Sequence, residues 1–391
     1  MNLVDKVFVL EVTAKASLPV LESCKAMGLR VVVGASRKHC CGMYSRAVDE
    51  KVYYPDVNVD PKACYDTILE YVQNSNVSVL IPCGDVMTDL IAQHQDEIRK
   101  YTKLLLPSYD IFVKGRNKVD TLKAAHKAGC PIPLTWYPDD EPLDTIIEKI
   151  PRFPVLIKPA ISAGSRGITI CNDAEEVISG YNKIKDQYGQ SFIQEYVPQT
   201  GVQYKVDAVM DCSQELYTGV VYSKLRYYPP TGGSSVLNRT EYQPDILRQS
   251  VNIMKELKWV GICDFDFITD PRDGVVKLME INPRFPESFR ATVAGGVDMT
   301  KIICQLALGV EVEKQLDYAE NKYNRFLFGD IMWFLKTKED RLKAKPNFFD
   351  FFDKDTYYQI IRKNDLGPLL GYIMENGEML WNRKLRKHRL R

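Results

Sequence analysis

The sequence is poor in histidine, and its four histidines stand apart from every segment that resembles a site. They are His39, His94, His126 and His388. None of them lies in an acidic hairpin or a glycine-rich segment. The composition therefore disfavours a histidine general base or a histidine-ligated zinc.

Paired cysteines, long apolar runs and a strong net charge are also missing. The ten cysteines form no C-x-x-C pair and no regular spacing, so we expect reduced thiols in a cytoplasmic protein. We expect neither a signal peptide nor a membrane span, because no apolar run approaches roughly 18 residues. With 52 basic and 51 acidic residues the net charge is +1, so no overall field favours nucleic acid or a membrane as partner.

A dinucleotide-binding fingerprint is absent as well. Residues 1–110 alternate apolar strands, at 7–10, 30–33 and 77–82, with helical stretches, which predicts a parallel sheet covered on both faces. A Rossmann domain places G-x-G-x-x-G after its first strand, but residues 11–17 read EVTAKAS. NAD binding is therefore disfavoured.

The rest of the chain divides into three further parts. Residues 111–197 predict a helical bridge followed by a small α/β unit, and residues 198–310 predict a larger antiparallel sheet followed by a helix. Residues 311–391 form a C-terminal extension with no clear pattern. The basic end at 383–391 is either a solvated terminus or a contact for an anion or a partner.

Residues 266–284, DFITDPRDGVVKLMEINPR, are the most informative stretch. The pattern predicts a β-hairpin whose turn is at 270–274. Side chains alternate faces along a strand, so Glu280 and Asn282 point the same way, and pairing across the hairpin can bring Asp266 beside them. Two carboxylates and an amide oxygen suit Mg²⁺. The alternative is a charged hairpin with a solvated face.

Lys158 ends an apolar strand and precedes the small-residue segment 162–167, SAGSRG. Such a loop lets backbone N–H groups approach phosphate oxygens while the ammonium neutralises charge, although many such loops are plain hairpins. Lys118 could bring a second cation to the same phosphates, or it could be a solvated helix lysine. Residues 192–198, FIQEYVP, form an apolar strand that breaks at a proline, either a slot for adenine or a linker.

The order of these features resembles the ATP-grasp superfamily. From about residue 5 to 310 the chain resembles the carbamoyl phosphate synthetase and biotin carboxylase branch, and within it the single-chain carboxylate–amine ligases. The most specific part is EINPR at 280–284, and residues 79–85 resemble the end of the preceding domain. The resemblance implies an α/β ATP-grasp fold: an N-terminal parallel-sheet domain (pre-ATP-grasp), a small α/β lid and an antiparallel-sheet catalytic subdomain.

The resemblance also implies roles for individual residues. Asp266, Glu280 and Asn282 would hold two Mg²⁺ ions, with Mn²⁺ as a possible substitute. Gln203 stands where the family usually has a glutamate for the ribose hydroxyls, and Asp266 replaces a longer glutamate or glutamine. The residues implied to bind ATP are Lys118, Lys158, Ser162, Gly164, Ser165, Gly167, Gln194, Glu195, Val197 and Gln203.

The substrate side carries two further expectations. Arg284 is expected to clamp the substrate carboxylate, because guanidinium binds such groups bidentately, and with Lys158 it is expected to act in catalysis. The segment 222–235 is expected to border the acceptor site, or else to be a flexible hairpin. Its candidate substrate contacts are Lys224, Arg226, Gly232, Gly233 and Ser234.

These features predict an ATP- and Mg²⁺-dependent ligase that activates a small carboxylate, of an amino acid or a small acid, as an acyl phosphate and joins it to an amine. The absence of a credible nucleophile agrees, because this route needs no covalent enzyme intermediate. The alternatives are a small-molecule kinase on the same fold and an ATP-binding sensor or scaffold without turnover. Related ligases are commonly dimers, so a homodimer is possible.

Overall fold

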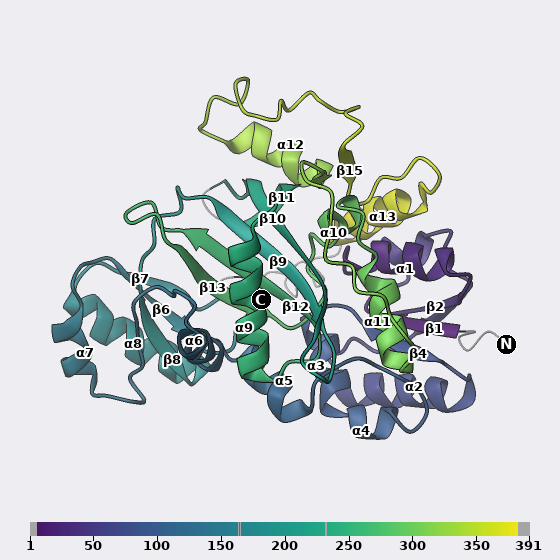
Figure 1. Ribbon diagram of the computed structural model, residues 1–391, viewed down its shortest axis with the longest axis horizontal. Helices are drawn as coiled ribbons and strands as arrows, with labels where there is room; N and C mark the ends of the chain where they lie inside the picture. The colour runs from purple at the N-terminus through teal and green to yellow at the C-terminus, as the bar shows by residue number, and fades with distance from the viewer. Residues whose placement is uncertain (1–5, 163, 165, 231–232, 382–391) are drawn as a thin grey trace.

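The computed structural model describes residues 6–162, 164, 166–230 and 233–381 (Figure 1). Three sheets organise this part of the chain: a four-stranded sheet at the N-terminus, a four-stranded sheet in the small α/β unit, and a seven-stranded sheet. Among the described residues, no helix is both long enough and apolar enough to cross a membrane.

The N-terminal sheet is parallel, with the strand order β3-β2-β1-β4, as the sequence predicts. All four residues of β4 are buried, and Val7 of β1 pairs with Val31 on one side and Val79 on the other. The edge strand β3 alternates in exposure and was not predicted. The elements are β1 (Lys6–Leu10), α1 (Ser17–Ala26), β2 (Arg30–Ala35), η1 (Gly42–Tyr44), β3 (Glu50–Tyr53), α2 (Pro61–Asn74), β4 (Val79–Pro82), α3 (Asp85–Gln93) and α4 (Gln95–Ile98).

Two helices then lead into the small α/β unit, which lies at the left of Figure 1. Its antiparallel sheet has the order β5-β8-β6-β7, and α8 packs on β6, β7 and β8 around a small apolar core. The small α/β unit predicted within residues 111–197 is present. The elements are α5 (Tyr109–Arg116), α6 (Lys118–Lys127), β5 (Thr135–Trp136), α7 (Leu143–Lys149), β6 (Val155–Pro159), β7 (Thr169–Cys171), α8 (Ala174–Tyr188) and β8 (Ser191–Glu195).

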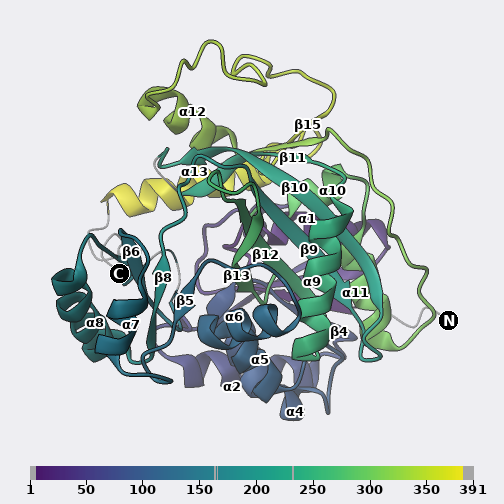
Figure 2. The ribbon, with the colours of Figure 1, turned by 60° about the vertical axis from the view of Figure 1, so that its left-hand side comes forward.

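The seven-stranded sheet has the order β13-β12-β9-β10-β11-β14-β15. Every neighbouring pair is antiparallel except β14 and β15. Helix α9 packs against β9 and β10 and lies across the sheet in both ribbon views (Figures 1 and 2). The elements are β9 (Gln203–Met210), β10 (Leu216–Tyr228), β11 (Ser234–Thr240), α9 (Pro244–Leu257), β12 (Gly261–Thr269), β13 (Val276–Asn282), α10 (Arg290–Ala294) and α11 (Met299–Leu308).

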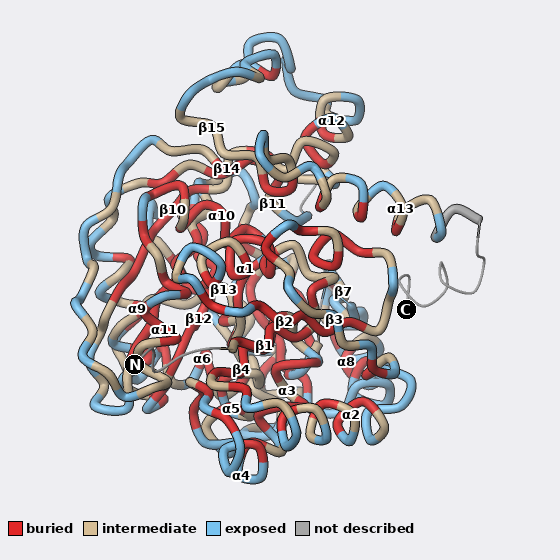
Figure 3. Tube along the Cα trace, turned by 90° about the vertical axis from the view of Figure 1, so that its right-hand side faces the viewer, coloured by how far each residue is buried: buried red, intermediate tan, exposed pale blue. Residues whose placement is uncertain are grey.

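The segment after residue 310 adds to this sheet and to the N-terminal part. Its strands β14 (Tyr323–Arg325) and β15 (Thr356–Tyr358) extend the large sheet, α12 (Leu327–Lys336) packs on β10 and β11, and α13 (Gly367–Trp381) contacts η1. Buried residues follow the strands of the N-terminal and large sheets, whereas the segment between α12 and β15 is mostly exposed (Figure 3).

Candidate active site

The acidic hairpin forms as predicted, from β12, a turn at 270–274 and β13. The turn closes through Gly274, whose N–H donates to the carbonyl of Asp270 at 2.8 Å and whose φ is +74°. Asp266 lies directly opposite Glu280, and Asp264 directly opposite Asn282. Directly opposed residues point to the same face of a sheet. The hairpin therefore brings the three predicted metal ligands together.

The Asp266 carboxylate is held by two lysines in this arrangement. Lys205 Nζ lies 3.0 Å from Asp266 Oδ2, and Lys224 Nζ contacts Oδ1. Burial alone raises the pKa of Asp266, but these two ammonium groups hold it well below its usual range. Asn282 also donates its amide to Asp266 Oδ2 at 3.2 Å. Asp266 is therefore ionised and already neutralised by lysines.

Glu280 is the freer of the two predicted carboxylate ligands. Its side chain is 40% exposed, and its ion-pair partner among the described residues is Lys118 at 3.8 Å. The described residues hold no group of three or more His, Cys, Asp and Glu side chains arranged to bind a metal. Glu280 and the amide oxygen of Asn282 fit a hard cation that keeps most of its waters, with Asp266 contributing through water or after Lys224 moves.

Two buried carboxylates beside this hairpin were not identified from the sequence. Asp264 and Asp207 are 0% exposed and face each other across β12 and β9. Burial, opposed by Lys205, raises the pKa of Asp264 to about 6, and burial reinforced by Asp264 raises the pKa of Asp207 to about 8. Asp207 accepts hydrogen bonds from Tyr222 at 3.1 Å and Thr292 at 2.5 Å. Both lie in apolar strands, whose pattern predicts core positions and not functional ones.

The raised pKa of Asp207 makes folding pH-dependent. Because its pKa in the folded protein, about 8, lies above the ordinary value of 3.8, the stability that its protonation contributes is fully present below pH 3.8 and is lost progressively as pH rises through 8. The free energy of unfolding of Asp207→Asn, relative to that of the wild type, is expected to rise by at least about 1 kcal/mol as the pH goes from 5 to 8. Urea unfolding at both pH values measures this. The surface variant Asp245→Asn is the control, and an equal Asp207→Asn difference at both pH values would contradict the assignment.

The predicted phosphate-binding lysines converge on the hairpin. Lys118, the first residue of α6, donates to the Ser162 carbonyl at 2.8 Å and lies beside Glu280. Lys158 on β6 is buried and donates to Gln194 Oε1 at 2.7 Å. Burial lowers the pKa of Lys158 to about 8, and Lys118 lowers it further against the attraction of Glu280. Two cations from separate elements therefore lie at one end of the hairpin.

The glycine loop is described only in part. Ser162 accepts the bond from Lys118, and Gly164 and Gly167 have φ values of +63° and +76°, which L side chains rarely adopt. A Cβ at Gly167 would lie 2.6 Å from Pro159, so the loop needs glycine there for close packing as well. Ser165 lies outside the described residues.

The predicted adenine hinge follows β8. Glu195 is 2% exposed, accepts from the Leu134 N–H at 3.0 Å and pairs with Arg272 Nη2 at 2.8 Å. Its side chain therefore ties the small unit to the hairpin turn, and its backbone N–H donates to the Leu134 carbonyl at 2.8 Å. Val197 is buried, and Gln203 donates to Gln199 at 3.0 Å.

The predicted substrate contacts lie in two different environments. Arg284 pairs with Asp85 of the N-terminal part at 2.8 Å and with Asp264 on β12 at 3.4 Å. It therefore lies between the N-terminal part and the seven-stranded sheet. Lys224 reaches Asp266. Arg226 instead pairs with Asp330 at 3.0 Å and stacks 4.4 Å from the Trp333 ring, so it is engaged with α12 rather than with the hairpin.

The connection between β10 and β11 holds the remaining predicted substrate contacts. Gly233 leaves no room for a Cβ, which would lie 2.3 Å from the Tyr228 carbonyl, and Ser234 pairs with Tyr228 at the start of β11. Gly232 lies outside the described residues.

Lys15, after β1, pairs with Glu287 at 2.5 Å. No local sequence pattern predicts this pair, because its partners are distant in the chain.

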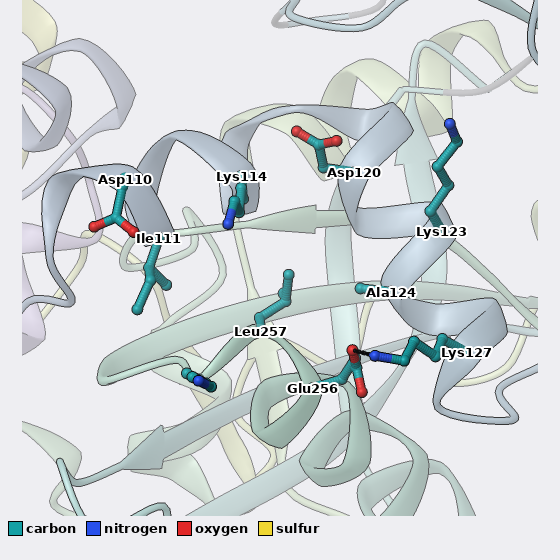
Figure 4. Close-up of a pocket in the computed structure, with 10 residues that line it drawn as sticks. Asp110, Ile111, Lys114, Asp120, Lys123, Ala124, Lys127, Glu256 and Leu257 are labelled. Carbon is teal, nitrogen blue, oxygen red and sulfur yellow. Dashed lines mark hydrogen bonds and ion pairs between the residues drawn. The ribbon is translucent and has the colours of Figure 1, made fainter. Parts of the chain in front are cut away.

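A separate pocket of about 520 Å³ lies between α5, α6 and α9 (Figure 4). Lysines and acids surround it, including Lys114, Asp120 and Glu256, and Glu256 pairs with Lys127 at 2.6 Å. None of the predicted site residues lines this pocket.

The chain is similar to known proteins in sequence and in fold. Residues 208–315 match the family model described as the carbamoyl-phosphate synthase L chain, ATP binding domain. A D-aspartate ligase of Enterococcus faecium is 24% identical over 360 residues, which cover 86% of this chain and 83% of the ligase.

Two solved structures show the same fold. The biotin carboxylase of Campylobacter jejuni superposes with a TM-score of 0.68 at 13% identity, covering 82% of this chain and 74% of its own. An L-amino acid ligase of Bacillus licheniformis gives a TM-score of 0.58 at 14% identity, covering 78% and 74%. Over residues 208–315 the chain thus resembles the carbamoyl-phosphate synthase ATP-binding domain, and its fold is that of the biotin carboxylase and the L-amino acid ligase.

Proposed function

We propose that this protein is an ATP- and Mg²⁺-dependent ligase that activates a small carboxylate as an acyl phosphate and joins it to an amine. The observation that carries the proposal is the convergence of Lys118, Lys158 and Glu280, from α6, β6 and β13, at one end of the acidic hairpin. This arrangement suits a triphosphate with its metal. Both the D-aspartate ligase and the L-amino acid ligase that the chain resembles are named as ligases of amino acids, which supports an amino acid as the acid.

The reaction follows from charge. The carboxylate of the acid attacks the γ-phosphorus of ATP, the bond from that phosphorus to the ADP oxygen breaks, and ADP leaves. Attack brings two anions together, and the ammonium groups of Lys118 and Lys158 offset that repulsion. Arg284 orients the acid, since a guanidinium can hold a carboxylate through two hydrogen bonds. The amine then attacks the acyl carbon, phosphate leaves, and the amine loses one proton to give the amide.

The metal, ligand and assembly assignments extend the proposal. Glu280 and Asn282, with Asp266 through water, would hold Mg²⁺, which would supply Lewis-acid stabilisation of the phosphates. We propose two such ions, with Mn²⁺ able to replace them. Backbone groups at 195–197 frame the adenine, and the glycine loop at 162–167 covers the phosphates. We further propose a cytoplasmic enzyme that is able to form a homodimer, with small-molecule substrates as its partners.

A substrate screen tests the function. We expect release of ADP and phosphate from ATP that requires both an amino acid as donor and a second amino acid or amine as acceptor. Screening pairs of amino acids, L and D, with a coupled ADP assay measures this. Transfer of phosphate to one acceptor with no amine requirement would show a kinase instead. Nucleotide binding without turnover across the whole panel would show a sensor or scaffold.

A further inference from the structure

Two asparagines lie side by side on the catalytic face of the large sheet. Asn238 on β11 pairs in register with Lys224 on β10 and with Asn324 on β14. Directly opposed residues share a face with their Cβ atoms about 5 Å apart, so the row Lys224, Asn238, Asn324 continues the polar face that begins at the hairpin. The far end of the Lys224 side chain reaches Asp266. The row therefore leads from the proposed ATP site into the substrate side.

The two amides have unused hydrogen-bonding capacity. Asn238 and Asn324 are each 1% exposed. Neither the oxygen nor the nitrogen of the Asn238 amide has a hydrogen-bond partner among the described residues, and the Asn324 oxygen has none either. The Asn324 nitrogen donates to the Ser288 carbonyl at 3.4 Å, four residues beyond Arg284. Buried polar groups are normally paired, so three unpaired groups in one row indicate a missing partner.

The unpaired groups define what that partner must offer. Two amide oxygens require a group with several donors, and the Asn238 amide nitrogen requires an acceptor. An ammonium group has three donors, and a neighbouring carboxylate supplies the acceptor. The α-amino acid zwitterion carries both groups on one carbon atom. The Lys224 ammonium group adds no net repulsion toward a bound ammonium group, because it is paired with the Asp266 carboxylate.

We propose that Asn238 and Asn324 form the subsite for the α-ammonium group of the amino acid that the enzyme activates. The proposal rests on the ligase function proposed above and names its substrate class, because an acid that lacks the amino group would leave the amides unpaired. Sites that hydrogen-bond a substrate group discriminate strongly against analogues without it.

The test compares each amino acid with its deaminated counterpart. ADP formation and calorimetric binding are measured for aspartate against succinate and for alanine against propionate, with the wild type and Asn238→Leu. In the wild type we expect the better amino acid to exceed its counterpart by about 100-fold in kcat/KM. In Asn238→Leu we expect this preference to fall to less than about tenfold, because the amino acid loses its hydrogen-bonding partner and its deaminated counterpart does not.

Stability separates a binding role from a structural role. Asn238→Leu replaces an unpaired amide by an apolar group of similar shape, so we expect its Tm to stay level or rise. The exposed helix variant Asn74→Ala is the control. An unchanged amino-acid preference in Asn238→Leu would overturn the proposal and leave the amides with a buried water only. If the wild type turns over no pair, the ligase function fails; calorimetry then decides the subsite, and equal binding of aspartate and succinate overturns it.

Discussion

Replacing Glu280 with glutamine is expected to abolish ADP formation while leaving the fold intact. The substitution keeps the shape of the side chain and removes its charge, and kcat should fall by at least about 10³-fold, because electrostatic stabilisation of the transferred phosphoryl group is lost. The free energy of unfolding should change by less than about 0.5 kcal/mol. The Glu280 side chain is 40% exposed, and its partner is a lysine as far away as 3.8 Å, so no buried network depends on it.

The measurement pairs steady-state ADP release at saturating ATP and Mg²⁺ with urea unfolding of the same preparation. Glu215→Gln is the matched control, since Glu215 is also a partly exposed glutamate paired with a lysine, here Lys314 at 2.9 Å. It should retain full activity. Near-normal turnover in Glu280→Gln would remove Glu280 from the metal site, and loss of both activity and cooperative unfolding would show a structural role instead.

Local patterns made the hairpin and the parallel sheet predictable. The apolar runs of β1, β2 and β4 are strands buried on both faces, and such runs are typical of parallel sheets. The turn at 270–274 contains proline, aspartates and glycine between two alternating strands, so the pattern alone predicts that Asp266, Glu280 and Asn282 lie together. Their lysine partners could not be predicted, because Lys205 and Lys224 come from β9 and β10, and only the register of the sheet brings them to Asp266.

The same limit explains Arg226 and Glu195. Arg226 lies in a glycine- and proline-rich segment that reads as a substrate loop, yet its partner Asp330 is 104 residues away on α12. Glu195 reads as a ligand-binding residue, whereas its carboxylate joins Arg272 and Lys277 across the hairpin turn. Charged residues on strands can be recognised from sequence, but which opposite charge they meet depends on long-range packing. Asp207 gave no signal at all, because one acid in an apolar strand carries no pattern.

Replacing Lys158 with methionine is expected to lower kcat/KM for ATP by about 10²- to 10³-fold, the range seen when one buried donor to a developing anion is removed. Methionine keeps most of the length and the apolar stem of the side chain but no charge. The ammonium group is buried on β6 and held by Gln194 at 2.7 Å, so its position is set before the nucleotide arrives. Steady-state kinetics with varied ATP measures the effect, and a loss confined to the KM of the acid would contradict a phosphate role.

The pH dependence gives Lys158 a second, independent signature. Because burial lowers the pKa of Lys158 to about 8, the group is cationic at pH 7 and becomes neutral as pH rises above 8. The parameter kcat/KM reports ionisations of the free enzyme, so for ATP it should fall by about tenfold per pH unit above 8. In Lys158→Arg the fall should disappear, because a guanidinium stays protonated throughout this range. A variant whose activity falls as steeply as that of the wild type would assign the ionisation to another group, whereas a flat profile identifies Lys158 as the cation that ATP requires.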